Sequence, residues 1–278
     1  MKAAPFAFER PSNLKAAIAL MAETNGAAKI MAGGQSLGPM LNLRLVRPDL
    51  IIDITGLAEL KQAERDGDEL VIGACVTHGD IEDGRVPDVT RGAMQRVASN
   101  IAYRAVRNRG TIGGSLSHAD PAADWVSALP ALGAKIRLRG PKGHRDLPIE
   151  DFMTGALESA LDANELVESV RVPVRRASAR WAYVKACRKP GEFAHAIAAV
   201  LIDPEAATGR VVIGAIEAPP IVLRDASVLF GGKISGNFKK EFVASAADTL
   251  MQKAGVANAT DRHIHVAILR RAIEEATA

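Results

Sequence analysis

The sequence predicts an α+β protein in which α/β lobes are followed by an antiparallel sheet with helices. Its 278 residues exceed the roughly 150 that one domain commonly uses. Helix-like and strand-like periodicities alternate up to about residue 175. Beyond a basic stretch at 175–180, long strand-like runs follow one another at short intervals. We therefore expect two lobes at 1–55 and 56–175, and a C-terminal α+β domain at 176–278.

The first lobe is predicted to hold one amphipathic helix and two short strands. Ser12 is a suitable N-cap, and Gly26 lies just beyond the expected end of the helix. The apolar positions of that helix follow helical spacing: Leu14, Ala17, Ile18 and Met21. Strand-like runs at 29–32 and 50–54 enclose a glycine-rich segment, which predicts a small α/β unit.

The later elements follow from the same two periodicities. In the second lobe we expect strands at 69–74, 135–139 and 166–173, and helices starting at Thr77 or His78, across 89–98 and across 122–132. In the C-terminal domain we expect strands at 181–186, 195–202 and 211–216, a hairpin connection at 203–209, and helices at 239–254 and 262–276.

Composition and charge exclude several classes of protein. Aromatic residues make up 4% of the chain, which is too few for a surface that stacks single-stranded nucleic acid. The net charge of +3 is too small to indicate a phosphate backbone as partner. The first ten residues lack the apolar core of a secretory signal, and no stretch is apolar enough to span a membrane. We expect a cytoplasmic protein with no nucleic-acid partner and no membrane span.

The two cysteines, Cys75 and Cys187, stand far apart in the chain. Their spacing matches no disulfide framework, zinc site or iron–sulfur cluster. We interpret both as buried apolar side chains.

Two glycine-rich segments are the main candidates for a binding site. The first is Ala32, Gly33, Gly34, Gln35, Ser36 and Leu37, and the second is Gly110, Thr111, Ile112, Gly113, Gly114 and Ser115. Backbone N–H groups freed by glycines, with a hydroxyl beside them, suit the oxygens of a diphosphate. Neither segment matches the G-x-G-x-x-G or P-loop pattern. A pair of ordinary turns is the alternative, and it is weaker for two segments than for one.

The continuous run 107–124, taken with 32–36, resembles the medium, FAD-binding subunit of molybdenum hydroxylases, the group of aerobic carbon monoxide dehydrogenase and xanthine dehydrogenase. The resemblance covers nearly the whole chain, including 183–199. It implies a two-lobed FAD-binding domain (PCMH-type) followed by a C-terminal antiparallel sheet with helices. It also implies non-covalent FAD, whose diphosphate is bound by the backbone of 32–37 and 111–114 with Ser36 and Ser115 beside it.

The resemblance assigns further roles, each with a plainer alternative. Lys29 would compensate diphosphate charge, or be a solvent lysine. Asp120 and Asp124 would accept hydrogen bonds from ribose or ribityl hydroxyls, or serve a helix start at which Asp120 is the N-cap. His118 would form part of the wall rather than ligate a metal.

Four more positions come from the second half of the chain. Leu166 or Val167 would cover the adenine end. Lys185 would lie near the flavin ring, where a cation favours reduced flavin, or face solvent on its strand. Phe193 would pack at the ring face, or be a core phenylalanine.

The function that the resemblance implies is electron transfer. The molybdenum cofactor and [2Fe–2S] clusters would lie on partner subunits, because two distant cysteines cannot hold a cluster. FAD on this chain would pass electrons from those clusters to an external acceptor, with a large molybdenum subunit and a small [2Fe–2S] subunit in a dimer of heterotrimers, a heterohexamer. The chain offers no nucleophile with a paired base, so we expect no substrate turnover by it alone. The alternatives are a stand-alone flavin oxidoreductase of the same superfold, a two-component flavoprotein without molybdenum, and a non-redox binding module that has lost FAD.

Overall fold

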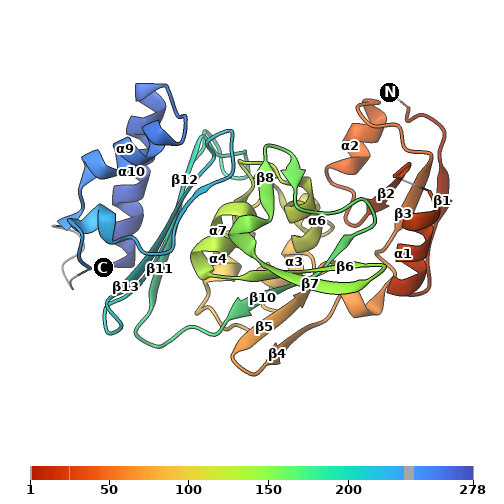
Figure 1. Cartoon of the computed structure of the whole chain (residues 1–278), viewed down its shortest axis with the longest axis horizontal. Helices are drawn as coiled ribbons and strands as arrows, with labels where there is room; N and C mark the ends of the chain where they lie inside the picture. The colour runs from red at the N-terminus through yellow and green to blue at the C-terminus, as the bar shows by residue number, and fades with distance from the viewer. Residues whose placement is uncertain (1, 25, 235–240, 278) are drawn as a thin grey trace.

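The fold is three sheets in a row, with helices between and beside them (Figure 1). The structure is a computed structural model that describes residues 2–24, 26–234 and 241–277. Its mixture of helices with one small parallel sheet and larger antiparallel sheets confirms the predicted α+β class.

The first sheet is parallel and has the strand order β1-β3-β2. Its strands are β1 (Ala7–Glu9), β2 (Ala28–Met31) and β3 (Leu50–Asp53), and its helices are α1 (Leu14–Glu23) and α2 (Leu37–Asn42). The four expected apolar positions of α1 are buried. The N-cap is Asn13 rather than Ser12, because the Asn13 side chain accepts a hydrogen bond from the backbone N–H of Ala16.

The second sheet is antiparallel, with the order β4-β5-β10-β6-β7. Its strands are β4 (Ala63–Asp66), β5 (Glu69–Gly73), β6 (Lys135–Gly140), β7 (Gly143–Pro148) and β10 (Leu166–Pro173). The helices of this lobe are α3 (His78–Glu82), α4 (Ala93–Ser99), α5 (Arg104–Arg107), α6 (Ile112–His118) and α7 (Asp124–Leu132). A small hairpin pairs β8 (Met153–Gly155) with β9 (Glu158–Ser159).

Helix α4 begins later than the sequence predicted. Its expected first turn is instead a loop in which the Asp88 side chain accepts hydrogen bonds from the backbone N–H groups of Thr90 and Gly92. Gly92 has a φ of 80°, a left-handed conformation that a helix cannot include.

The third sheet is antiparallel, and helices pack on both of its faces. Its order is β11-β12-β13-β14, with β11 (Arg180–Ala186), β12 (Ala196–Asp203), β13 (Thr208–Gly214) and β14 (Ile221–Leu223). One face packs on α9 (Ala244–Lys253) and α10 (Ala259–Ala276), and the other packs on α7. Of the helix expected at 239–254, Lys239 and Lys240 lie outside the described residues. Helix α10 starts three residues before the expected 262, because Asn258 caps it.

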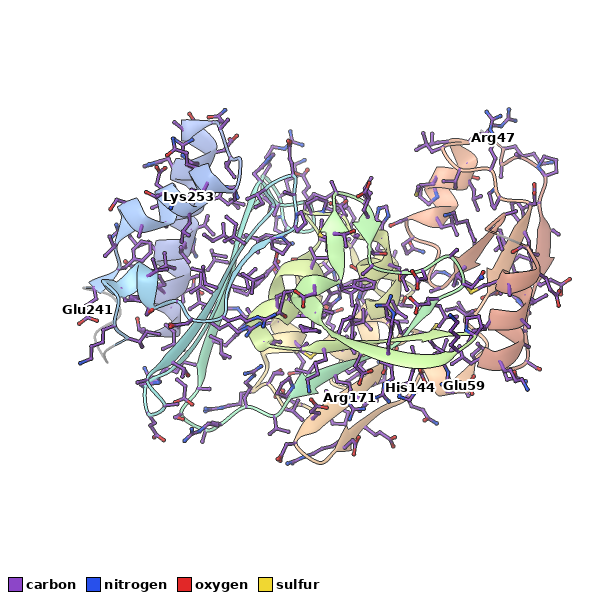
Figure 2. The ribbon with its side chains drawn as sticks, viewed as in Figure 1. Arg47, Glu59, His144, Arg171, Glu241 and Lys253 are labelled. Atoms are coloured by element: carbon purple, nitrogen blue, oxygen red, sulfur yellow. The ribbon has the colours of Figure 1, made fainter. Side chains whose placement is uncertain are left out.

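Side chains fill the spaces between these layers; Arg47 lies beside the first sheet, and Glu241 and Lys253 lie at the opposite end of the molecule (Figure 2). Arg171 on the central strand β10 bonds to Glu69 and Asp66 on β5 and β4, each at 2.7 Å. The Arg171 hydrogen bond is the main reason that the pKa of Glu69 is lowered. Within the described chain, every helix is too short or too polar to cross a membrane.

Candidate cofactor-binding site

The two glycine-rich segments lie in direct contact. A Cβ atom added to Gly33 would overlap the carbonyl oxygen of Arg109 and lie 2.9 Å from the Cα of Gly110. A Cβ atom on Gly114 would lie 3.7 Å from the Cβ of Ala32. Glycine at position 33 therefore allows the two backbones to touch, and together they form one site.

The first segment supplies the free backbone donors. Among the described residues, no acceptor takes the N–H groups of residues 33–37. Gly34 has a φ of 70°, and the Gln35 side chain donates to the carbonyl of Gly33 at 3.1 Å. Successive free N–H groups around a left-handed residue form a concave anion site, with the Ser36 hydroxyl at its end.

The second segment differs from the expectation, because most of its N–H groups already have acceptors. Ile112 and Gly113 donate to the carbonyls of Val76 and Ala74, and Gly114 donates to Oγ1 of Thr111, the N-cap of α6. Gly113 is needed for packing, since an added Cβ would lie 2.5 Å from that of Ala74. The backbone between Ile112 and Gly114 is thus not a set of free donors. The donors of this segment without an acceptor among the described residues are the backbone N–H of Thr111 and the hydroxyls of Thr111 and Ser115.

A buried histidine, His78, makes a hydrogen bond to the backbone of the second segment. The His78 backbone N–H donates to the carbonyl of Gly110 at 2.9 Å. Its ring nitrogen Nδ1 accepts a hydrogen bond from Nε1 of the fully buried Trp125 at 3.1 Å, so the neutral ring carries its proton on Nε2. Burial lowers the pKa of His78 to about 4, with a further contribution from the charge of Arg107.

This histidine predicts an acid-sensitive stability. The unfolded chain binds a proton at His78 near pH 6.5, whereas the folded chain does so only near pH 4. Lowering the pH through this window should therefore reduce the free energy of unfolding, by up to about 3 kcal/mol. Urea unfolding at several pH values tests this, with His78→Gln as the comparison. An equal pH slope in both proteins would contradict the assignment.

Asp124 and Lys185 form a buried ion pair. Lys185 Nζ lies 2.9 Å from Oδ1 of Asp124, and their side chains are 8% and 10% exposed. The Tyr183 hydroxyl donates to the same oxygen at 2.7 Å, and Lys185 also donates to the carbonyl of Asn100 at 2.8 Å. The alternative of a solvent lysine at position 185 is therefore wrong. Burial raises the pKa of Asp124, and the charge of Lys185 opposes this shift.

Contact between these two residues also changes their expected roles. The sequence interpretation placed Lys185 at the flavin ring and Asp124 at the sugar chain, remote from it. The ion pair joins them in one group, so a change at either residue also changes the surroundings of the other. The second carboxylate oxygen of Asp124 has no hydrogen-bond partner elsewhere in the described chain. That oxygen is free to accept a hydrogen bond from a hydroxyl group.

Asp120 does not cap α7. Its carboxylate accepts from the backbone N–H of Ala122 at 2.9 Å, within a turn that precedes the helix. The N-cap of α7 is Ala123, and Asp124 occupies the first turn. The turn delays the helix by two residues relative to the predicted start, and this delay places Asp124 opposite β11.

Four other predicted site residues are either exposed or buried. Phe193 is 67% exposed, so the alternative of a core phenylalanine is wrong. Lys29 is exposed on β2, and Leu166 and Val167 are buried in two apolar clusters. Because the last two side chains already have apolar neighbours, their predicted contact with adenine would involve little of their surface.

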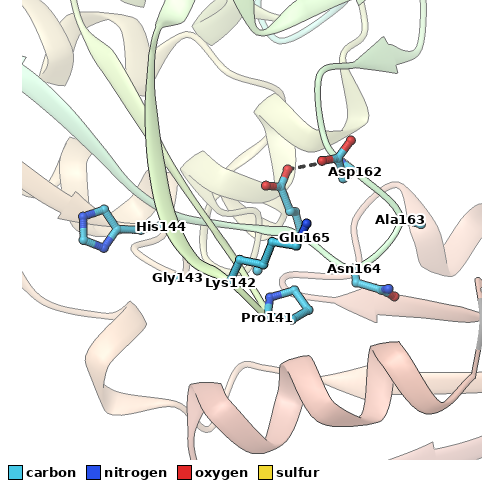
Figure 3. Close-up of a pocket in the computed structure, with 9 residues that line it drawn as sticks. Pro141, Lys142, Gly143, His144, Asp162, Ala163, Asn164 and Glu165 are labelled. Carbon is cyan, nitrogen blue, oxygen red and sulfur yellow. Dashed lines mark hydrogen bonds between the residues drawn. The ribbon is translucent and has the colours of Figure 1, made fainter.

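A pocket of about 360 Å³ lies between the β6–β7 turn and the turn at 162–165 (Figure 3). Lys142, His144 and Glu165 are among its lining residues, and Glu165 accepts a hydrogen bond from the backbone of Asp162. No residue of the glycine-rich segments lines it. Its last lining residue, Glu165, directly precedes Leu166 in the sequence.

Sequence reasoning missed Tyr183 and His78. Tyr183 and Lys185 are two residues apart on a strand, so both side chains point to the same face, and this pattern could have revealed the pair. Nothing in the sequence around His78 indicated its bond to Trp125. Cys75 is buried as predicted, but Cys187 is only partly buried. The described residues include no group of three or more side chains suited to a metal ion.

Comparison with known proteins agrees with this geometry. Residues 4–175 match the family described as the FAD binding domain in molybdopterin dehydrogenase. The chain belongs to this family, and the expected FAD cofactor is confirmed at the level of the family.

Individual relatives are oxidoreductase subunits. The chain is 38% identical to the caffeine dehydrogenase subunit beta of a Pseudomonas species over 74% of this chain and 70% of that one. It is 34% identical to the carbon monoxide dehydrogenase medium chain of Hydrogenophaga pseudoflava, over 87% and 85%. A solved structure of reconstituted carbon monoxide dehydrogenase from Oligotropha carboxidovorans matches with a TM-score of 0.88 at 26% identity, covering 100% of this chain and 99% of that one.

Proposed function

We propose that this chain is the FAD-carrying electron-transfer subunit of a molybdenum hydroxylase. The observation that carries the proposal is the contact between the two glycine-rich segments, the first of which has free backbone N–H groups. The buried Asp124–Lys185 pair adds a carboxylate and an ammonium group. The proposed route takes electrons from [2Fe–2S] clusters on a small partner chain to an external acceptor. The molybdenum cofactor belongs to a large partner chain, and the proposed assembly is a cytoplasmic dimer of heterotrimers.

The residues of this chain fit FAD in chemical type. Residues 33–37 would bind the diphosphate through N–H groups, and the Thr111 and Ser115 hydroxyls would approach from the opposite side. Asp124 would accept a hydrogen bond from a sugar or ribityl hydroxyl, and Lys185 would place a charge near the ring. Bound flavin supplies the capacity to exchange one or two electrons. Phe193, whose side chain is exposed, would contact the ring face.

A tag on this chain, used for purification from the natural host, tests the proposal. We expect one FAD per chain, released by acid precipitation because neither glycine-rich segment contains Cys or His to form a covalent link. We expect molybdenum, iron and two further chains in the same complex. Substrate should reduce the flavin only in the complex. A chain that purifies alone and turns over a substrate unaided would contradict the proposed relay.

A further inference from the structure

We propose that Arg107 is a positioning residue for Lys185, acting through the backbone of residues 100–102. The inference rests on the proposed function for its relevance to the flavin ring, but its geometry belongs to this chain alone. Arg107 lies on α5, away from the Asp124–Lys185 pair, and no contact joins it to either residue directly.

All three nitrogens of the Arg107 guanidinium donate hydrogen bonds. Nε and Nη2 bond to the two carboxylate oxygens of Glu82 at 2.7 and 3.0 Å. Nη1 donates to the carbonyls of Ile101 and Ala102 at 3.0 and 2.9 Å. The Arg107 side chain is 12% exposed, so solvent screens these bonds little. The Arg107 hydrogen bond is also the main reason that the pKa of Glu82 is lowered.

The backbone held by this fork touches the candidate site at two points. The carbonyl of Asn100 accepts the hydrogen bond from Lys185 Nζ at 2.8 Å. The carbonyl of Ala102 packs against Gly191, where an added Cβ would lie 2.6 Å away. Gly191 precedes the exposed Phe193 by two residues. One short segment therefore supports both residues predicted at the flavin ring.

The segment 100–102 needs contacts from other residues to keep its conformation, because Ala102 has a φ of 42°. A residue other than glycine in this left-handed region is strained, and the surrounding structure must maintain it. The two carbonyl contacts of Arg107 are located at this strained residue and its neighbour. Without them, the segment can relax, and the Asn100 carbonyl can leave Lys185.

Arg104 offers a matched control on the same helix. It also bonds to Glu82, at 2.8 Å, and to Asp83, but it makes no bond to the carbonyls of residues 100–102. Its side chain is 47% exposed. Removing Arg104 therefore removes a charge from the same cluster and leaves the segment held.

The test measures the reactivity of Lys185 toward an acylating reagent in the purified full chain, by mass spectrometry. We expect Arg107→Met to raise the rate at Lys185 by roughly tenfold or more relative to the exposed Lys135, because the charged Lys185 ammonium no longer donates a hydrogen bond to the Asn100 carbonyl. Arg104→Met should leave the rate unchanged. Arg107→Lys should give an intermediate rise, since an ammonium group cannot reach Glu82 and both carbonyls.

A lower unfolding midpoint in Arg107→Met with an unchanged Lys185 rate would show a purely structural role and overturn the proposal. If Arg107→Met does not fold, Arg107→Lys takes its place, and an unchanged Lys185 rate there has the same meaning. Flavin content is measured separately on the same samples. A wild-type complex without FAD would overturn the proposed function, whereas the labelling result would still decide the role of Arg107.

Discussion

We expect the Asp124→Ala substitution to lower the free energy of unfolding by about 3–5 kcal/mol relative to the wild type. The change leaves the Lys185 ammonium buried with only the Asn100 carbonyl as partner, and it leaves the Tyr183 hydroxyl without an acceptor. Removing one member of a buried ion pair costs more than the pair itself contributes, because the remaining charge is uncompensated. Urea unfolding at pH 7 measures the difference.

A double-mutant cycle separates pairing from packing. We expect Asp124→Asn and Lys185→Met each to be destabilising, and the double variant to be more stable than the sum of the two losses predicts, by about 1–3 kcal/mol. Additive losses would show that the pair contributes nothing beyond two separate side chains. In the flavin-loaded protein, both single variants should change FAD retention and reduction potential together, because the residues are in contact.

The Gly33→Ala variant should separate the two glycine-rich segments. The new Cβ would overlap the carbonyl oxygen of Arg109, a backbone atom that cannot move without its whole segment. We expect a loss of about 1–3 kcal/mol in stability from overpacking. We also expect FAD affinity to fall by roughly 100-fold, the equivalent of one or two charge-assisted hydrogen bonds.

Gly38→Ala is the matched control for this variant. Gly38 lies on α2 in the same part of the chain, and an added Cβ meets nothing within 4 Å. Alanine there should leave FAD binding intact and slightly favour the helix. Equilibrium dialysis with FAD and thermal unfolding of both variants test the contrast. Equal FAD affinity in the two variants would show that close approach of the segments is not required for binding.

The sequence predicted most of the fold because its elements are strongly periodic. The buried face of α1 and the strands β6, β10 and β12 lie at or within one residue of their predicted positions. Most errors in the predicted elements occurred at helix starts, where local side chains decide, and β13 begins three residues before its predicted start of 211. Asn13 caps α1 by accepting from the backbone N–H of Ala16. Asp88 and Asp120 instead bond to backbone N–H groups in the loops that replace the expected first turns of α4 and α7.

The candidate site was predicted as separate motifs, and its connections were not. Which N–H groups of the second segment are free depends on Ala74 and Val76, far from it in sequence. The pairing of Asp124 with Lys185 depends on how the third sheet packs against α7, mainly through β12 and β13. Such long-range contacts leave no periodic signal in one sequence. The exposure of Phe193 was likewise not readable from the sequence; it excludes the core interpretation, and packing at the ring face stays a prediction.

The burial of helix α7 determines where the chain can be cut without exposing its core. The family match ends at residue 175, but all nine residues of α7 are buried, and Tyr183, Ile197 and Val212 belong to the same apolar cluster as this helix. The family match therefore ends inside one apolar cluster. We expect a chain cut at that point to expose one face of α7 and to lose both donors to Asp124, so that the remaining part would hold the cofactor poorly.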